Sequence, residues 1–220
     1  MSIRKIPFAS GEFYHLYNRG NSKQKIFHNA EDYARFMGLL YACNQKENFK
    51  IDNLSKGESL YETEKRSKLV SIGAYVLMPN HFHLLITNKE ENNISKFMQK
   101  ISTAYVMYYN KKYERTGGLF EGKFKSQHLN TDRYLKYIFS YIYLNPVKLI
   151  DSKWKDRGIQ NKQKALKFLK KYTYSSYLDY LGINRLQNKI LDTKAFPKYF
   201  PDKRSFLNEI FDWLNYKDFR

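Results

Sequence analysis

Cysteine is nearly absent from this chain of 220 residues, in which Cys43 is the only one. A single thiol excludes a disulfide framework and every metal or redox site built on paired cysteines. No apolar run approaches the length of about 18 residues that a transmembrane helix needs. The first residues also lack the apolar segment of a secretory signal. We therefore expect a cytoplasmic protein without membrane spans.

Acidic residues are few beside the basic ones. The chain has 39 Lys and Arg against 21 Asp and Glu, which gives a formal net charge of +18. The cations are spread along the chain and interleaved with 20 Tyr and 16 Phe. Cations neutralise phosphates and aromatic rings stack on unpaired bases, so this composition favours a nucleic acid as partner. A basic surface that serves only solubility is the alternative.

Hydrophobic periodicity predicts an α+β protein. We expect strands and helices in the order β-α-β-β-α-β, followed by one more helix that begins at Thr131 and ends before Pro146. This order matches the ferredoxin-like fold, an antiparallel sheet with helices on one face. The predicted strands cover residues 13–18, 69–77, 81–87 and 119–129, and the first two predicted helices cover residues 30–45 and 94–113.

The chain divides by composition into two parts. Residues 1–150 contain the predicted ferredoxin-like domain. Residues 151–220 are rich in Lys and contain apolar clusters, which predicts a basic, mainly helical C-terminal extension. No specific motif is visible in the extension.

Two histidines stand two positions apart on the third predicted strand. His81 and His83 project from the same face of a strand, while Phe82 between them projects from the other. Two imidazoles placed in this way on a rigid element can bind one divalent cation. An ordinary pair of sheet histidines is the alternative, because a His-x-His spacing alone is a weak signal.

A tyrosine and an amide are four residues apart near the end of the last predicted helix of the domain. Tyr141 and Asn145 therefore share one helix face. Beside a metal-activated phosphodiester, the tyrosine can act as a covalent nucleophile and the amide oxygen can complete the metal shell. The alternatives are a core aromatic for Tyr141 and a helix C-terminal residue for Asn145.

With these features together, the sequence resembles the single-tyrosine HUH endonucleases. Within them it is similar to the REP-associated tyrosine transposases and related insertion-sequence transposases. The resemblance runs in register over residues 10–150. Its four ordered motifs are Tyr14–Gly20, Gly73–Leu85, Gly118–Lys125 and Tyr134–Lys148.

The resemblance implies a site and a chemistry. His81 and His83 match the metal ligands for Mg²⁺ or Mn²⁺, Tyr141 matches the nucleophile, and Asn145 stands where relatives place a Gln or Asn ligand. Imidazole would also accept Co²⁺ or Zn²⁺. The implied activity is cleavage and joining of single-stranded DNA beside a hairpin, through a covalent 5′-phosphotyrosine.

Two other tyrosines are alternatives for the nucleophile. Tyr137 lies on the Tyr141 face, one turn earlier, whereas Tyr143 is turned well away. The register against Asn145 favours Tyr141. The resemblance is compatible with a monomer and with a homodimer.

Several basic residues are candidate contacts for DNA phosphates. Lys123 and Lys125 are the preferred pair, because they would share one face of the predicted strand 119–129. His15 on the first strand would neighbour the strand of His81 and His83, and a role at the site, in packing or in DNA contact stays open. The candidate cations are Arg4, Lys5, Arg19, Lys23, Lys123, Lys125 and Lys136.

Two further functions compete with the transposase. One is a domesticated protein that binds single-stranded or hairpin DNA without cutting it. The other is an RNA-binding module of ferredoxin-like fold with bases stacked on exposed sheet aromatics. The second leaves the histidine pair and the Tyr141–Asn145 spacing unexplained.

Overall fold

The computed structural model describes residues 8–47, 59–63 and 67–215. Two of the candidate cations, Arg4 and Lys5, lie outside these ranges. The predicted order of elements is confirmed for the first part of the chain. It runs β1 (Phe13–Arg19), η1 (Asn21–Lys23), α1 (Ala30–Ala42), β2 (Ser71–Met78), β3 (His81–Thr87), α2 (Asn93–Lys112), β4 (Lys125–His128), α3 (Asp132–Leu144) and η3 (Asn145–Leu149).

The four strands form one antiparallel sheet in the order β2-β3-β1-β4. This is the strand order of the predicted ferredoxin-like fold. Strands β2 and β3 form a hairpin in which Met78 pairs with His81. The register of the hairpin shifts beside Gly73, where an added Cβ would come within 2.8 Å of the ring of Phe196. A side chain at position 73 would therefore displace a buried aromatic ring.

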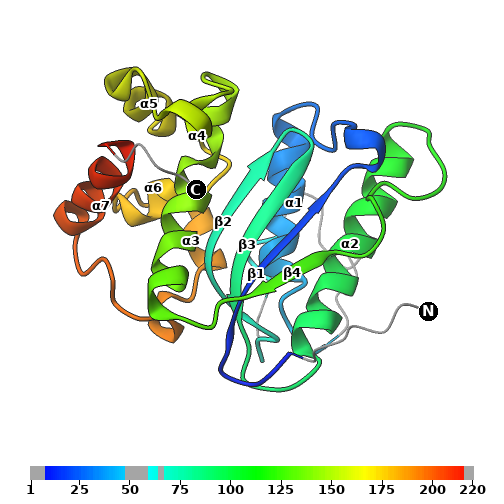
Figure 1. Ribbon diagram of the computed structural model, residues 1–220. Helices are drawn as coiled ribbons and strands as arrows, with labels where there is room; N and C mark the ends of the chain where they lie inside the picture. The colour runs from blue at the N-terminus through cyan, green and yellow to red at the C-terminus, as the bar shows by residue number, and fades with distance from the viewer. Residues whose placement is uncertain (1–7, 48–58, 64–66, 216–220) are drawn as a thin grey trace.

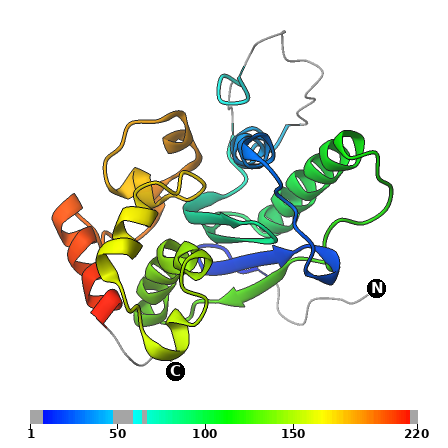
Figure 2. The same ribbon diagram turned by 90° about the horizontal axis from the view of Figure 1, so that it is seen from above.

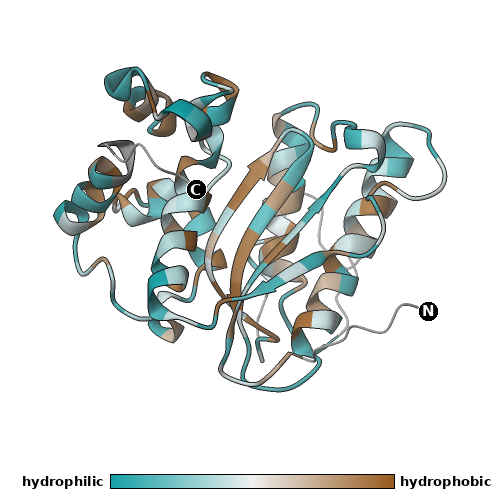
Figure 3. Ribbon diagram, in the orientation of Figure 1, coloured by the Kyte–Doolittle hydropathy of each residue, from teal (hydrophilic) through white to brown (hydrophobic). Residues whose placement is uncertain are grey.

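Helices cover both faces of the sheet. Figures 1 and 2 show α1 and α2 on one face and α3 on the other. Phe82 and Leu84 belong to the core that the sheet forms with α1 and α2, whereas Val76 and Leu85 belong to the core that it forms with α3. Strands β2 and β3, buried on both sides, are hydrophobic over most of their length in Figure 3. Strand β4, at one edge of the sheet, alternates between exposed and half-buried residues, so this edge is more open to solvent than β2 and β3 are.

The helices begin where polar caps satisfy their first backbone N–H groups. Asn29, the predicted N-cap of α1, accepts a hydrogen bond from the backbone N–H of Asp32. Thr131 caps α3 in the same way and accepts from the backbone of Tyr134 at 3.2 Å. Helix α1 ends at Ala42, earlier than predicted. Beyond it the side chain of Asn44 exchanges two hydrogen bonds with the backbone of Val70, just before β2.

The predicted strand 119–129 is mostly wrong, because only Lys125–His128 forms β4. Leu119 instead accepts a backbone hydrogen bond from Asn21, and Phe120 makes an isolated bridge with Gly20. Gly122 then takes a φ of +68°, a left-handed conformation that interrupts a strand. The segment before β4 is thus a loop that lies against the end of β1.

The second part of the chain is helical as far as the structure describes it. Its elements are α4 (Trp154–Arg157), α5 (Lys162–Leu169), α6 (Tyr177–Tyr180), η4 (Leu186–Ile190), η5 (Thr193–Ala195) and α7 (Lys203–Asn215). Trp154 and Phe206 are fully buried in the same core as α3. The backbone around Ser175 pairs with the outer edge of β2, where Leu77 donates to Tyr174 at 2.9 Å and Ser176 donates to Tyr75 at 3.0 Å. In the described ranges no helix is long and apolar enough to cross a membrane.

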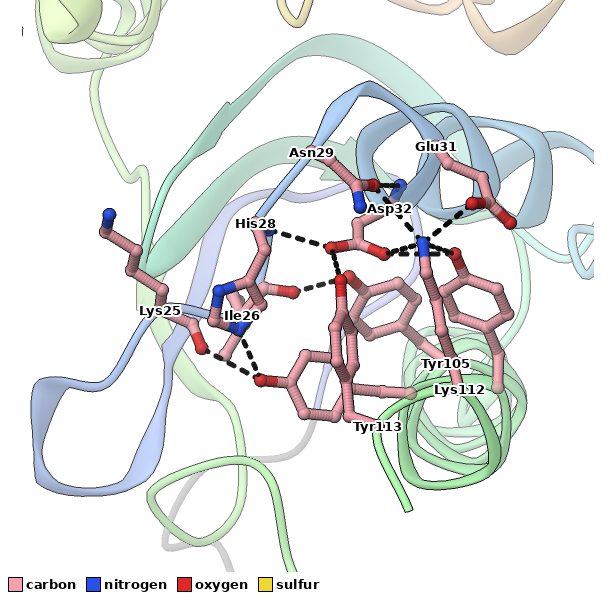
Figure 4. A network of polar contacts seen from close by, with 11 residues as sticks. Lys25, Ile26, His28, Asn29, Glu31, Asp32, Tyr105, Lys112 and Tyr113 are labelled. Carbon is pink, nitrogen blue, oxygen red and sulfur yellow. Dashed lines mark hydrogen bonds and ion pairs between the residues drawn. The ribbon is translucent and has the colours of Figure 1, made fainter. Parts of the chain in front are cut away.

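A buried carboxylate joins α1 to α2 on the face opposite α3 (Figure 4). The side chain of Asp32 has no exposed surface and accepts from Lys112 Nζ at 2.8 Å. It also accepts from the hydroxyls of Tyr108 at 3.0 Å and Tyr113 at 2.7 Å, and from the backbone N–H of His28 at 2.8 Å. Burial alone would raise the pKa of this carboxyl, but these donors outweigh it and hold the pKa below its ordinary value.

Candidate active site

The histidine pair lies on the α3 side of the sheet. His81 and His83 alternate with the core residue Phe82, as predicted. The register places Tyr17 of β1 directly opposite His83 and Arg19 opposite His81. Directly opposed residues of antiparallel strands project to the same face, so β1 and β3 together present these side chains towards α3.

His15 joins the pair from the neighbouring strand. Its Nε2 lies 2.8 Å from Nδ1 of His83, and the two rings are stacked with centroids 5.0 Å apart. Tyr141 of α3 approaches both rings edge-on, at 5.4 Å from His83 and 5.7 Å from His15. The candidate nucleophile therefore lies against the candidate metal-binding strand, although the two are far apart in sequence.

A neighbouring amide fixes the proton on His81. Asn80 donates its Nδ2 to the backbone oxygen of Lys23 at 3.2 Å, which leaves its Oδ1 to accept from Nδ1 of His81 at 2.6 Å. His81 therefore carries its proton on Nδ1 and its lone pair on Nε2. Such a contact orients a metal-ligating imidazole in many metalloproteins.

Asn145 is the C-cap of α3 and is 3% exposed. Its Oδ1 is buried and has no hydrogen-bond partner. Burial raises the pKa of Tyr141, and a hydrogen bond with Asn145 and the positive charge of Lys148 lower it only in part. Tyr141 is consequently a phenol, not a phenolate, at neutral pH in this structure.

The two alternative tyrosines are distributed as predicted. Tyr137 lies on the Tyr141 face, with ring centroids 6.0 Å apart. Tyr143 is fully buried on the other side of α3, where it packs against Tyr180 and Phe206. Burial raises its pKa well above the ordinary value. A phenol in that position has no access to a polymer in solvent.

The donor set mixes nitrogen and oxygen ligands. Two imidazoles and one carboxamide oxygen are ligands that Mn²⁺ accepts, and the orphaned Oδ1 of Asn145 is a buried oxygen that lacks a partner. Among the described residues, no group of three or more His, Cys, Asp or Glu could hold a metal ion. A metal here would thus need the amide and oxygens from outside the protein.

The candidate cations are spread unequally around this face. Lys125 lies opposite Tyr17 on β4, in the same row of the sheet as His83. Arg19 is at the end of β1, but it forms an ion pair with Glu121. Lys136 is turned to the other side of α3 and pairs with Glu209 of α7 at 2.7 Å. Lys123 is exposed in the loop before β4, so it does not share a strand face with Lys125.

Three contributors escaped the sequence analysis. Asn80 contacts His81, Tyr17 lies beside His83, and Lys148 acts on the pKa of Tyr141. Tyr17 could have been found, because it stands two positions after His15 and must project to the same face. Lys148 gave no such signal, since its position depends on how η3 continues from α3.

A separate hollow of about 520 Å³ lies between η3 and the first helices of the second part. Its apolar walls include Val147 and Ile159. Its rim carries Lys153, Arg157 and Lys164, of which Arg157 pairs with Asp151 at 3.3 Å. None of the predicted site residues lines it.

The sheet order, the histidine strand and the tyrosine helix define a ferredoxin-like α+β protein with a candidate metal and nucleophile site on one face. The sequence model of the family described as "Transposase IS200 like" matches residues 10–145. The chain belongs to this transposase family. The matched residues include β1 to β4 and α3 with Tyr141 and Asn145.

One solved structure agrees on the fold. It is described as the REP-associated tyrosine transposase bound to a REP hairpin and has a TM-score of 0.52 at 12% identity, covering 85% of this chain and 90% of that chain. At this identity the likeness shows the fold alone. The tRNA(His) guanylyltransferase from Saccharomyces cerevisiae, at 12% identity over 91% of this chain and 87% of its own, has a TM-score of 0.38, which is too low to support an argument. No curated protein matches the sequence.

Proposed function

We propose that this protein is a metal-dependent transposase that cleaves and rejoins single-stranded DNA through Tyr141. The family is one of transposases, and its solved neighbour is described as bound to a REP hairpin. By analogy, the substrate of this chain is single-stranded DNA beside a hairpin. The observation that carries the proposal is the edge-on contact of Tyr141 with His83 and His15.

The covalent step is a transesterification. The phenolic oxygen of Tyr141 attacks the phosphorus, the bond from phosphorus to the 3′-oxygen breaks, and the 5′-phosphate becomes linked to the tyrosine. The phenolic proton is lost from Tyr141 and the released 3′-oxygen gains one, so the step is balanced in atoms and charge. The reverse reaction with another 3′-OH joins strands without an added energy source.

Three side chains would hold the metal. They are His81 through Nε2, His83 through Nε2, and Asn145 through its orphaned Oδ1. When bound, Mg²⁺ or Mn²⁺ supplies positive charge to the scissile phosphate. His15 and Asn80 support this set by contacting Nδ1 of His83 and of His81. Lys148 favours the phenolate that forms on Tyr141 during attack.

The test is a covalent-adduct assay with the full chain. A labelled single strand that includes a hairpin from DNA flanking the gene is incubated with Mn²⁺, with Mg²⁺ or with EDTA, and resolved on a denaturing gel. We expect a protease-sensitive adduct with metal and none with EDTA. Tyr141→Phe abolishes the adduct, while Tyr137→Phe, the matched control on the same helix face, retains it.

Other outcomes would change the assignment. Loss of the adduct in Tyr137→Phe but not in Tyr141→Phe would move the nucleophile one turn along α3. Tight DNA binding without an adduct across metals and flanking sequences would favour the domesticated binder.

A further inference from the structure

A row of tyrosines continues from the candidate site along α3. Tyr134, Tyr137 and Tyr141 are spaced by three and four residues, so they share one helix face. Successive ring centroids are 6.1 Å and 6.0 Å apart, and the rings of Tyr134 and Tyr137 are within 19° of parallel. All three are partly exposed, in contrast to the buried Phe139 and Tyr143 of the same helix.

The sheet supplies the opposite side of this row. The ring of Tyr17 lies 5.8 Å from His83 and is partly exposed. The same His83 ring lies 5.4 Å from Tyr141 of α3, so Tyr17 and Tyr141 both lie beside His83. Figure 1 shows α3 running alongside the face of the sheet on which these residues lie. The aromatic surface is therefore shared between a helix and a strand.

Charge is placed beside the rings. Lys125 pairs in register with Tyr17 at the β4 edge and is exposed, and Lys148 is exposed beyond Tyr141. Rings with cations alongside are the combination that binds single strands, since bases stack on the rings while phosphates meet the cations. A duplex cannot use the rings, because its bases are already stacked on each other.

We propose that Tyr134 and Tyr137, with Tyr17 across from them, form a stacking surface for unpaired bases next to the scissile phosphate. The proposal rests on the proposed function, which places the scissile phosphate at Tyr141. It adds a role that does not depend on cleavage: the tyrosine row selects single-stranded over paired DNA. Tyr134 and Tyr137 bind bases and take no part in the covalent step.

Binding of unreactive DNA tests the surface. The probe is fluorescein-labelled (dT)15 in EDTA at fixed salt, measured by anisotropy against the same strand paired with (dA)15. Tyr134→Leu and Tyr137→Leu keep apolar volume against the core but remove the ring. Each should weaken binding of the single strand by about 5- to 150-fold and leave the duplex nearly unchanged. Tyr134→Phe and Tyr137→Phe should bind like the wild type.

Tyr41→Leu is the matched control, since Tyr41 is a half-buried tyrosine on α1, on the other face of the sheet. A single strand of 15 abasic sites gives a second measurement that needs no variant. The wild type should bind it much more weakly than (dT)15. Leucine variants that bind (dT)15 normally, or a wild type that binds the abasic strand equally well, would overturn the proposal. Loss in the Phe variants would do so too, because the hydroxyl and not the ring would then matter.

The two proposals fail separately. An adduct at Tyr141 together with ring-independent binding leaves the transposase standing and removes the stacking surface. Ring-dependent binding without an adduct would keep the stacking surface and remove the cleavage by Tyr141.

Discussion

Nε2 of His15 lies 2.8 Å from Nδ1 of His83, between two adjacent strands of the sheet. Both side chains are more than nine-tenths buried, at 7% and 6% exposure. The contact restricts rotation of the His83 ring. It also occupies Nδ1 of His83, so that Nε2 is the ring nitrogen that does not face His15.

Replacing His15 should therefore weaken metal binding without touching a ligand. We expect His15→Ala to lower the affinity for Mn²⁺ by about 10- to 100-fold, as for other residues that orient metal ligands. Titration calorimetry measures this directly, and His15→Gln should restore part of the affinity. His128→Ala is the control, because His128 lies on β4 and pairs with Glu12 away from the site. Unchanged affinity in His15→Ala would leave His15 with a packing role.

Asn145 should contribute to metal binding while lowering the stability of the folded protein. Its Oδ1 is buried without a partner, which costs the folded state free energy. We expect Asn145→Leu to keep the free energy of unfolding or raise it by about 1 kcal/mol, while Mn²⁺ affinity falls. Urea unfolding and calorimetry measure the two effects. A lower stability with unchanged Mn²⁺ affinity would identify Asn145 as a purely structural cap.

Asp32 should make stability depend on pH on the acid side. Its donors hold the pKa below that of the unfolded chain, so the ionised carboxylate stabilises the folded protein above about pH 4. This stabilisation is lost as the pH falls through the lower folded pKa. Asp32→Asn should cost about 2–4 kcal/mol at pH 7 and flatten the acid limb. Chemical unfolding at steps of about one pH unit between pH 3 and 7 measures the loss of stability at pH 7 and its dependence on pH.

Glu31→Gln is the control for Asp32, since Glu31 also contacts Lys112 at 2.8 Å but is 68% exposed. An exposed pair contributes at most about 1 kcal/mol. Equal losses in the two variants would show that burial of Asp32 has no special effect.

Arg185 should stabilise the second part of the chain through a buried ion pair beside the sheet. It pairs with Asp179, whose side chain is 4% exposed, and donates to the hydroxyl of Tyr75 on β2 at 3.2 Å. Arg185→Met leaves a buried carboxylate unpaired and should cost about 3–5 kcal/mol at pH 7. Burial raises the pKa of Asp179 even with Arg185 present, so the loss should shrink towards acid pH as the carboxyl gains a proton.

Urea unfolding at two pH values measures the effect of Arg185. Arg157→Met is the control, because Arg157 is 58% exposed in its pair with Asp151. A loss in Arg185→Met as small as that of the control would contradict a large contribution of the buried pair of Arg185 and Asp179.

Local sequence was enough to predict the sheet and its helices, because α1 and α2 bury apolar residues at helical spacing and β2 and β3 are short runs buried along their length. It was not enough for the segment before β4. Its aromatic and apolar residues suggest a strand, but Leu119 pairs with the chain after β1 and Gly122 turns left-handed. Both depend on contacts with residues that are distant in sequence.

In the candidate site, too, the local sequence predicted some features, while others depend on contacts between distant segments. Alternation on β3 and the four-residue spacing on α3 predicted which residues share a face. The approach of Tyr141 to His83 follows from how α3 packs on the sheet, which no local pattern encodes. Lys136 lies on the same helix, yet its pairing with Glu209 turns it towards α7. Charge alone could not predict that Lys125 lies on the side of the candidate site and that Lys136 does not.

The pairing of Ser176 with β2 has a consequence for synthesis on the ribosome. Tyr75 and Ser176 are 101 positions apart, so β2 emerges long before its outer neighbour. At about 5–20 residues per second, the wait is on the order of 5–20 seconds. During that time the outer edge of β2 has no cover from the same chain. A nascent chain stalled before residue 176 would therefore expose a strand edge on which chaperones and other nascent chains compete.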